Sequence, residues 1–578
     1  MLELSFKFQV PSFMWLKIKK EITGLIKKDF PEVKITEADF VFPPNPEFGD
    51  LSLPCFNFSK ALGSSPPEIA KELSEKIKPA GIVGKIVAAG PYLNFFLNKR
   101  KMARLVLNKI LKTKEKYGNS KVGKGKRVMI EFSNANTHKE YHVGHLRNLC
   151  YGDAVTRLLA ASGHRAIPVS YINDFGIHVA KTLWAYEKFY KNEKPPENLG
   201  YFLGQIYARS TQELEKNPEA KEEVSALMTK IESRRGPEYK LWQETREWSI
   251  KQFTEIYKEM GVSFDNIFYE SRVIDEGRKI VRELFQKNFL VKSQGAVIAN
   301  LEKYNLGVLL FLRSDGTALY PVADIPLAIK KFKKYKLDES IYVVDVRQSL
   351  YFEQLFKILE LLGYKQKMIH LGYEFVKLPS GMMSSRTGNV ITYENLRKEA
   401  TERATAEIKK RHADWNEKQI GETAEKIVVG AMRFEMVKVG KEQTITFDID
   451  RALHFEGLTA AYLQYTHARI CSIIRKAGIE ISGKIDFDKL REKWEYNLVI
   501  GLAKFPDVLE KAALSYSPAV LADYLYDLAK IFSDFYRDVK VIGGDPSAEK
   551  TRIALIGAVK IVLAKGLGLL GIAAPEEM

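Results

Sequence analysis

The chain has 578 residues, of which 46% are apolar and 28% charged, and its formal net charge is +17. These values are typical of a soluble globular protein of three or four domains and argue against a disordered or fibrous chain. No apolar run approaches the roughly 20 residues of a membrane span, and no clean signal peptide opens the chain, so we expect a cytoplasmic protein without membrane contact. Cys55, Cys150 and Cys471 lie far apart, which argues against a disulfide framework and a cysteine-rich zinc site.

The basic charge indicates a polyanionic partner such as a nucleic acid, although a basic surface kept for solubility is the alternative. The positive residues are spread over several segments, which favours a long footprint over a single basic tail. They gather in residues 99–116, 121–127 and 330–336.

The first part of the chain mixes helices with short strands. Ser65 followed by two prolines predicts a helix start, and residues 84–98 alternate in polarity as a strand does. Residues 100–113 predict another helix, and the Gly/Lys-rich stretch 118–126 predicts a linker.

A strand–helix–strand unit follows, with strands predicted at 127–132 and 164–172 around a helix at 142–163. Such a unit favours a parallel sheet. Residues 181–290 are mostly helical in pattern, so we expect a doubly wound sheet divided by a helical insertion. Later we predict strands on both sides of the turn in 307–322, a helix at 323–332, a strand at 340–346, a helix at 351–364, a strand at 367–376, and almost only helices beyond 395.

The motif with the strongest chemical content is "EFSNANTHKEYHVGHLRN" (131–148), which leaves the first parallel strand and opens a helix. A helix N-terminus suits a phosphate, His142 and His145 share one face of it, Gly144 allows close approach, and Lys139 adds a positive charge. The alternative is that the two histidines only cap the helix. Metal ligation is a weaker option, because no His-Glu-x-x-His motif is present.

The loop "LPSGMMSSRTGNV" (378–390) follows the last strand and has the glycines and serines of a phosphate-binding turn, but not its lysine. Two other motifs carry no function. "GLGLLG" (566–571) fits a dinucleotide fingerprint but ends an apolar helix, so it indicates packing. "DFG" (174–176) lacks the other kinase signatures.

Together, "HVGH" after the first strand and "MMSSRTGN" after the last are similar to the paired signatures of class I aminoacyl-tRNA synthetases. More narrowly, the chain resembles the arginyl-tRNA synthetase family along nearly its whole length, through blocks such as "AAGPYLNFFLN", "SDGTALYPVADIPLAI" and "GLTAAYLQYTHARICSIIRKAG". The resemblance implies an α/β fold: a Rossmann-like parallel-sheet catalytic domain (119–395, with a helical insertion at about 181–290), an α+β N-terminal domain that meets the tRNA elbow (1–118), and an all-α anticodon-binding bundle (396–578).

The resemblance also implies roles for individual residues. For catalysis they are Lys139, His142 and His145, and for ATP binding His142, Gly144, His145, Met383, Ser384, Ser385 and Arg386. For arginine they are Glu131, Ser133 and Asn136 at the ammonium and backbone end, and Tyr320, Asp324 and Gln348 around the guanidinium. For tRNA they are Tyr92, Asn94, Tyr462, Tyr465, Arg469 and Met578.

Each assignment has a simpler alternative. Asp324 before an early proline is also typical of a helix N-cap, Tyr320 of a core residue and Gln348 of a solvated helix start. Tyr462 and Tyr465 are also consistent with core packing. A carboxylate fits a guanidinium because it accepts two parallel hydrogen bonds, and this chemistry favours Asp324 as the arginine ligand.

The sequence departs from the family pattern at three places. His178 stands in "NDFGIH" where the family has Gln, and Arg347 stands in "VVDVRQ" where it has Asp. Met382 and Ser385 occupy the two positions where the signature loop usually has lysines. In this family a lysine just before the histidine motif often replaces the first of these, and Lys139 occupies that place.

We therefore expect an arginine–tRNA ligase that takes L-arginine, ATP with Mg²⁺, and tRNA(Arg), holds no metal of its own, and acts as a monomer. The family typically needs bound tRNA before it activates arginine. Two alternatives stay open at this point: a degenerate tRNA-binding protein, and another class I synthetase such as the cysteine enzyme, which would need zinc-binding cysteines.

Overall fold

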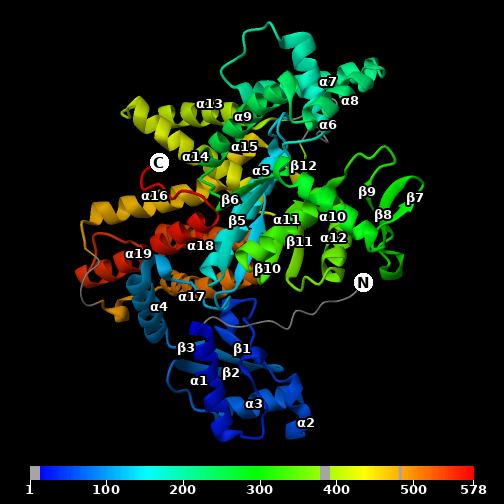
Figure 1. The fold of residues 1–578 in the computed structure, drawn as a ribbon. Coiled ribbons are helices and arrows are strands. Elements are labelled where there is room, and N and C mark those ends of the chain that lie inside the picture. Colours follow the sequence, from blue (N-terminus) through cyan, green and yellow to red (C-terminus); the bar gives the residue numbers. More distant parts are fainter. Residues whose placement is uncertain (1–12, 378–390, 481–484) are drawn as a thin grey trace.

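A computed structural model describes residues 13–377, 391–480 and 485–578, and its centre is a five-stranded parallel sheet (Figure 1). The strands run in the order β11-β10-β4-β5-β6, and every neighbouring pair is parallel. Their bounds are β4 Arg127–Glu131, β5 Arg165–Ile172, β6 Asn266–Tyr269, β10 Glu339–Asp345 and β11 Lys367–Tyr373. The chain winds outward from β4 in one direction and from β10 in the other, so the crevice for a ligand lies between β4 and β10 at their carboxyl ends.

The predicted strand–helix–strand unit is confirmed as β4, α5 (Val143–Ala161) and β5. α5 begins where predicted because His142 caps it in extended conformation and accepts a hydrogen bond from the backbone of Gly144. The later helices α11 (Tyr320–Tyr335) and α12 (Ser349–Leu361) alternate with β10 and β11, as the sequence pattern predicts.

The stretch 181–290 contains a feature that its helical pattern hides, because β6 lies inside it and forms the outer strand of the parallel sheet. The helices around it are α6 (Ile177–Ala185), α7 (Leu199–Lys216), α8 (Ala220–Glu232), α9 (Gly236–Glu259) and α10 (Ile274–Gln286). α6, α7 and α8 project from one end of the sheet (Figure 1). An antiparallel sheet of β7 (Val291–Ser293), β8 (Ala296–Asn300) and β9 (Val308–Leu312) follows.

Two strand predictions were wrong. Residues 84–98 form a hairpin of β2 (Val83–Ala89) and β3 (Tyr92–Leu97), because Gly90 has a positive φ of 55° and turns the chain. The second strand expected in 307–322 is only a bridge between Leu312 and Ala318, because α11 begins at Tyr320.

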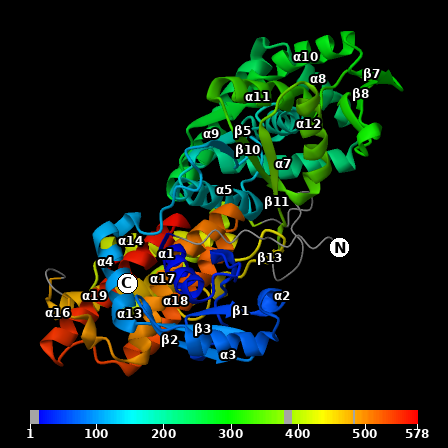
Figure 2. The same ribbon diagram turned by 90° about the horizontal axis from the view of Figure 1, so that it is seen from below.

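The N-terminal region is a three-stranded antiparallel sheet packed with helices, and it lies against the C-terminal helices (Figure 2). The indole N–H of Trp15 donates to the carbonyl of Ala503, and the hydroxyl of Tyr117 donates to that of Leu502. Its remaining elements are α1 (Phe13–Asp29), β1 (Leu51–Pro54), α2 (Ser59–Leu62), α3 (Pro66–Lys76) and α4 (Lys99–Thr113). Ser65 caps α3 in a reciprocal capping box, as predicted.

The C-terminal part is helical, as predicted, apart from the short β12–β13 pair that joins it to the sheet domain. The elements are β12 (Val376–Lys377), α13 (Tyr393–Arg411), α14 (Glu417–Val437), β13 (Ile445–Thr446), α15 (Ile449–Ala452), α16 (Ala460–Ala477), α17 (Lys493–Leu514), α18 (Pro518–Asp538) and α19 (Pro546–Leu569). The "GLGLLG" stretch lies at the end of α19 and serves helix packing, as expected. A Cβ on Gly566 would lie only 2.4 Å from the side chain of Leu525. Within the described residues no helix is long and apolar enough to cross a membrane.

Candidate active site and tRNA-facing groove

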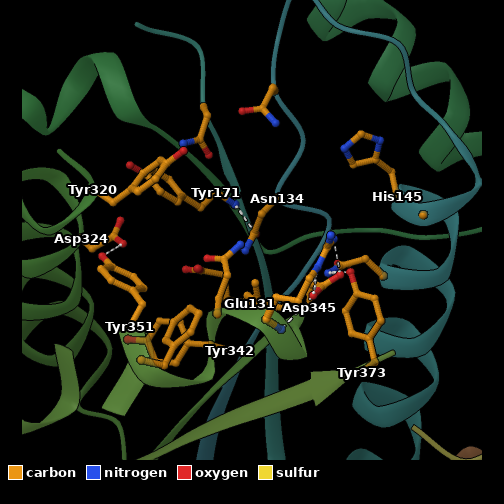
Figure 3. Close-up of a pocket in the computed structure, with 18 of the residues that line it drawn as sticks. Glu131, Asn134, His145, Tyr171, Tyr320, Asp324, Tyr342, Asp345, Tyr351 and Tyr373 are labelled. Atoms are coloured by element: carbon orange, nitrogen blue, oxygen red, sulfur yellow. Dashed lines mark hydrogen bonds and ion pairs between the residues drawn. The ribbon is translucent and has the colours of Figure 1, made fainter. Parts of the chain in front are cut away.

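A cavity of about 720 Å³ opens at the carboxyl ends of β4 and β10, the crevice that the strand order predicts. Figure 3 shows its two sides, with Tyr320 and Asp324 facing Glu131 across one part and His145 on the other. Eight of the predicted site residues line it: Glu131, Asn136, His142, Gly144, His145, Tyr320, Asp324 and Gln348. The fold therefore gathers residues that lie more than 200 positions apart in the sequence.

The two histidines cap α5 and also line the cavity, so the capping alternative and the binding prediction are compatible. The ring nitrogen Nδ1 of His142 accepts from Gly144, Nδ1 of His145 accepts from the backbone of His142, and the rings stack with centroids 3.9 Å apart. Burial, with Lys139 as a second cause, lowers the pKa of His142 to about 4. Burial also places the pKa of His145 well below its usual value, with the charges of His142 and Lys139 adding to the effect. Both imidazoles are neutral at pH 7 and offer N–H groups rather than charge.

Gly144 is needed at its position, because a Cβ there would lie 2.9 Å from the ring of His142. Lys139 does not line the cavity. Its ammonium lies 4.9 Å from the ring centroid of Tyr207 on α7, beside the histidines but on the side of the insertion.

The two flanks of segment 378–390 meet at the start of α5. After the segment, the backbone of Val143 donates to Ile391, and that of Tyr393 donates to Tyr141. Before it, the buried guanidinium of Arg147 on α5 donates to the carbonyls of Glu374 and Phe375. Predicted ATP ligands Met383, Ser384, Ser385 and Arg386 lie outside the described residues.

Asp324 lies in the second turn of α11, whose N-cap is Leu319, so the N-cap alternative for Asp324 was wrong. The hydroxyl of Tyr351 donates to its carboxylate, and the ring of Tyr320 meets that of Tyr351 edge-on. Burial raises the pKa of Asp324 to about 7. The Tyr351 bond and Lys331 oppose the rise, while Glu131 adds to it. Tyr320 is 65% exposed and Gln348 is exposed, so Tyr320 is not a core residue.

Glu270 is an acidic neighbour that the sequence analysis missed. It follows β6 directly, at the carboxyl edge of the sheet, and burial, then the charges of Asp324 and Asp174, raise its pKa to about 8. Sequence reasoning overlooked it because β6 was taken as part of a helical stretch. Glu270 does not itself line the cavity, but the charge of Asp324 contributes to its raised pKa, so the two acids lie close enough to interact. Two acids with raised pKa values in one region form a site suited to a cation.

Glu131 ends β4 and forms an ion pair with Lys331 of α11, a second residue that sequence reasoning missed. Ser133 is 1% exposed and does not line the cavity; its hydroxyl donates to Tyr257, and its backbone N–H donates to Asn148. Asn136 pairs through its backbone with Asn173 beside the cavity.

The two residues that depart from the family pattern take different places. Arg347 lines the cavity and donates two hydrogen bonds of 2.8 Å to Asp345, from Nε to Oδ1 and from Nη2 to Oδ2. Burial raises the pKa of Asp345, but the bonds from Arg347 outweigh it and hold the pKa below its ordinary value. His178 does not line the cavity and contacts the carbonyl of Asn173.

A second hollow of about 1000 Å³, here called the C-terminal groove, lies between α16, α18 and the end of the chain. Tyr465, Arg469 and Met578, three of the residues that the resemblance assigns to tRNA, line it together. The guanidinium of Arg469 lies 4.6 Å from the ring of Tyr465 and 5.4 Å from that of Tyr536. Tyr462 is not in the groove; its hydroxyl bonds to Ser533 between α16 and α18.

The two residues on the N-terminal sheet that the resemblance assigns to tRNA differ in their exposure. Tyr92 is 39% exposed and meets the exposed ring of Phe56 edge-on at 5.8 Å. Asn94 is buried, and its side-chain oxygen accepts a 2.6 Å hydrogen bond from Ser52. Asn94 therefore supports the sheet beneath Tyr92 rather than a surface contact.

Comparisons with known proteins cover nearly the whole chain. Family models match at residues 16–97 (arginyl tRNA synthetase N terminal domain), 106–449 (tRNA synthetases class I (R), catalytic domain) and 463–578 (DALR anticodon binding domain). The arginine–tRNA ligase of Bdellovibrio bacteriovorus is 36% identical over 96% of this chain and 98% of its own length, and that of Clostridioides difficile is 34% identical over 97% and 98%. The arginyl-tRNA synthetase of Thermus thermophilus has a similar structure, with a TM-score of 0.80 and 28% identity over 97% of this chain and 100% of its own.

Proposed function

The chain belongs to the arginyl-tRNA synthetase family, and from this premise we propose that it is an arginine–tRNA ligase whose reaction takes place in the cavity between β4 and β10. It activates L-arginine with ATP to give arginyl-adenylate and pyrophosphate, and then transfers the arginyl group to the 3′ end of tRNA(Arg) with release of AMP. The observation that carries the proposal is that one cavity holds both the capped histidines and the buried acids.

At the amino-acid end, the guanidinium meets Asp324, with Tyr320 and Gln348 beside it and Glu270 as a second acid. A guanidinium is planar with five donors, so the carboxylate of Asp324 and a tyrosine hydroxyl can both accept from it, whereas a lysine ammonium would leave acceptors unpaired. Glu131 and Asn136 hold the α-ammonium. Ser133 acts indirectly, through its bonds to Asn148 and Tyr257.

At the nucleotide end, the N-terminus of α5 and the N–H groups of His142 and His145 receive the phosphates, with Gly144 allowing the approach. The arginine carboxylate attacks the α-phosphate and pyrophosphate leaves, so negative charge grows on the phosphate oxygens. Neutral imidazoles fixed by capping bonds stabilise that charge without rearranging. Lys139 supplies the positive charge that Met382 does not, with residues 383–386 as further ATP contacts.

In this proposal Mg²⁺ enters the cavity bound to ATP. Among the described residues no group of three or more acidic, histidine or cysteine side chains is placed to hold a metal ion. The ion would therefore be held mainly by the phosphates, as is common for Mg²⁺, and when bound it neutralises the leaving pyrophosphate.

The tRNA footprint in the proposal runs from Tyr92 on the N-terminal sheet to the C-terminal groove with Tyr465, Arg469 and Met578. Support comes from the basic charge and from exposed aromatic rings, which can stack on unpaired bases. We include a requirement for tRNA in arginine activation. A connection between the two regions exists in Arg433 of α14, whose buried side chain bonds to Asp153 on α5 and to the carbonyl of Leu570, which follows α19. We also propose that the protein acts as a monomer in the cytoplasm.

Pyrophosphate exchange with arginine, in the presence and absence of tRNA(Arg), tests the proposal. We expect arginine-dependent exchange with tRNA and little without it, and no exchange with lysine. A chain that binds tRNA but shows no arginine-dependent exchange under either condition would be the degenerate tRNA-binding protein instead.

A further inference from the structure

Lys331 is a buried lysine in the wall of the proposed arginine cavity. Its side chain is 1% exposed and forms an ion pair with Glu131. Three aromatic rings surround its ammonium, with centroids 5.0 Å (Phe268), 5.7 Å (Tyr342) and 5.9 Å (Tyr171) away. Its neighbours Lys330 and Lys333 on α11 are exposed.

This burial needs a reason beyond stability. Removing an ammonium and a carboxylate from water costs several kcal/mol each, and well-packed apolar residues often stabilise a protein as well as a buried ion pair does. The pair also lies in the cavity itself, since Glu131 and Lys331 both line it. Lys331 follows Asp324 by seven residues, two turns of the same helix, so both face the cavity.

The titratable groups near Lys331 lie on several strands and helices at the end of the cavity where Glu131 and Asp324 face each other. Burial raises the pKa of Asp324, Glu131 raises it further, and Lys331 lowers it. Asp324 in turn contributes to the raised pKa of Glu270. The titratable groups facing this cluster are Glu131 (β4), Tyr171 (β5), Glu270 (after β6), Tyr320 and Asp324 (α11), Tyr342 (β10) and Tyr351 (α12).

We propose that Lys331 is a positioning residue for arginine: its ammonium holds Glu131 at the ammonium end of the cavity and keeps Asp324 in the charged form that a guanidinium needs. The inference rests on the proposed function and adds a residue to it. Lys331 takes no part in bond making; it acts through the two carboxylates.

The proposal predicts the direction in which the KM for arginine changes with pH. Arginine pairs with the carboxylate form of Asp324, so the KM for arginine rises as the pH falls through about 7, the pKa of that group. Without the Lys331 ammonium the pKa moves upward, because Glu131 and burial remain. The rise in KM then begins at a higher pH.

The test compares Lys331→Met with Lys330→Met, an exposed lysine on the same helix, by tRNA-supported pyrophosphate exchange from pH 6 to 9. A rise of about one unit in the pKa of Asp324, from about 7 to about 8, predicts for K331M a KM for arginine at least about fivefold higher than that of the wild type at pH 7. This ratio should fall as the pH rises to 9, towards the constant part that comes from the displaced Glu131. kcat should stay within about threefold, and K330M should match the wild type. A folded K331M whose KM ratio to wild type is the same at every pH overturns the inference.

A second variant keeps the test decisive where K331M does not fold. Glu131→Gln with Lys331→Met leaves neither buried charge unpaired. Both opposed influences on Asp324 are then gone, so KM should rise by a similar factor at all pH values. A factor that changes more than about threefold between pH 6 and 9 contradicts the inference. If the wild type shows no arginine-dependent exchange, the proposed function fails; if only the variants disagree, the inference alone fails.

Discussion

The cavity at the sheet edge and the C-terminal groove bind their ligands, in our proposal, by opposite means. The lining of the cavity includes buried groups such as Asp324 and His142, whose pKa values shift because water is excluded. Its residues come from strand ends and from helices α5 and α11 of the sheet domain. The groove is open, and its main contacts lie on successive turns of α16 and at the chain end. Buried charges give discrimination, because an unsuited ligand leaves them unpaired, whereas exposed rings and cations give affinity that tolerates variation.

Asp324→Asn should produce the largest effect, a loss of arginine activation in the cavity without a loss of tRNA binding. A neutral amide cannot pair with a guanidinium and leaves Tyr351 with a changed partner, so we expect arginine-dependent exchange to fall by about 10³-fold or more. The affinity for tRNA, measured by filter binding, should stay within about twofold. A parallel loss of tRNA binding would show that the two regions are not separate.

Lys139→Ala should slow arginine activation by roughly 10²-fold, the scale of losing one group that stabilises the transition state. Single-turnover adenylate formation measures this directly. Met382→Lys in the Lys139→Ala background should restore part of the rate, because it returns a cation to the usual place in the signature loop. An unaffected Lys139→Ala variant would make Arg386 the next residue to test.

Arg469→Ala should act on the groove alone. Losing the guanidinium that spans Tyr465 and Tyr536 should weaken tRNA binding about tenfold and lower the salt dependence of binding by about one ion. The KM for arginine should not change. Equal tRNA affinity for variant and wild type at every salt concentration would remove Arg469 from the footprint.

Tyr462→Phe should have the smallest effect. The Tyr462 hydroxyl bonds to Ser533 inside the helical bundle, so its loss should change tRNA affinity less than about twofold, with a small decrease in thermal stability. Tyr465→Ala, three residues along the same helix, should weaken binding clearly. A larger effect at Tyr462 than at Tyr465 would reverse our assignment of the two faces.

The sequence predicted much of the sheet domain because the hydrophobic periods of 127–172 and 323–376 are regular and the helix starts have clear caps. It missed β6, a four-residue strand next to long helices, and with it Glu270. It also missed the hairpin turn at Gly90, because 84–98 keeps its alternation through the turn.

Lys331 shows the limit of local patterns. It lies in a run of lysines that is typical of a solvated helix face, and only its spacing from Asp324 indicates that it faces inward. The ion pair with Glu131 joins positions 200 residues apart, which no local pattern contains. Ser133 and Asn94 illustrate the converse, since both were assigned to ligands and both are buried and bonded within the protein.

A crystal structure with a non-hydrolysable arginyl-adenylate analogue tests the central claim most directly. Our account predicts the guanidinium within hydrogen-bond distance of Asp324, with Glu270 as its acidic neighbour, the α-ammonium at Glu131, and the phosphate at the N-terminus of α5 beside His142 and His145. A guanidinium placed away from Asp324, with that carboxylate facing no cation, would contradict the account.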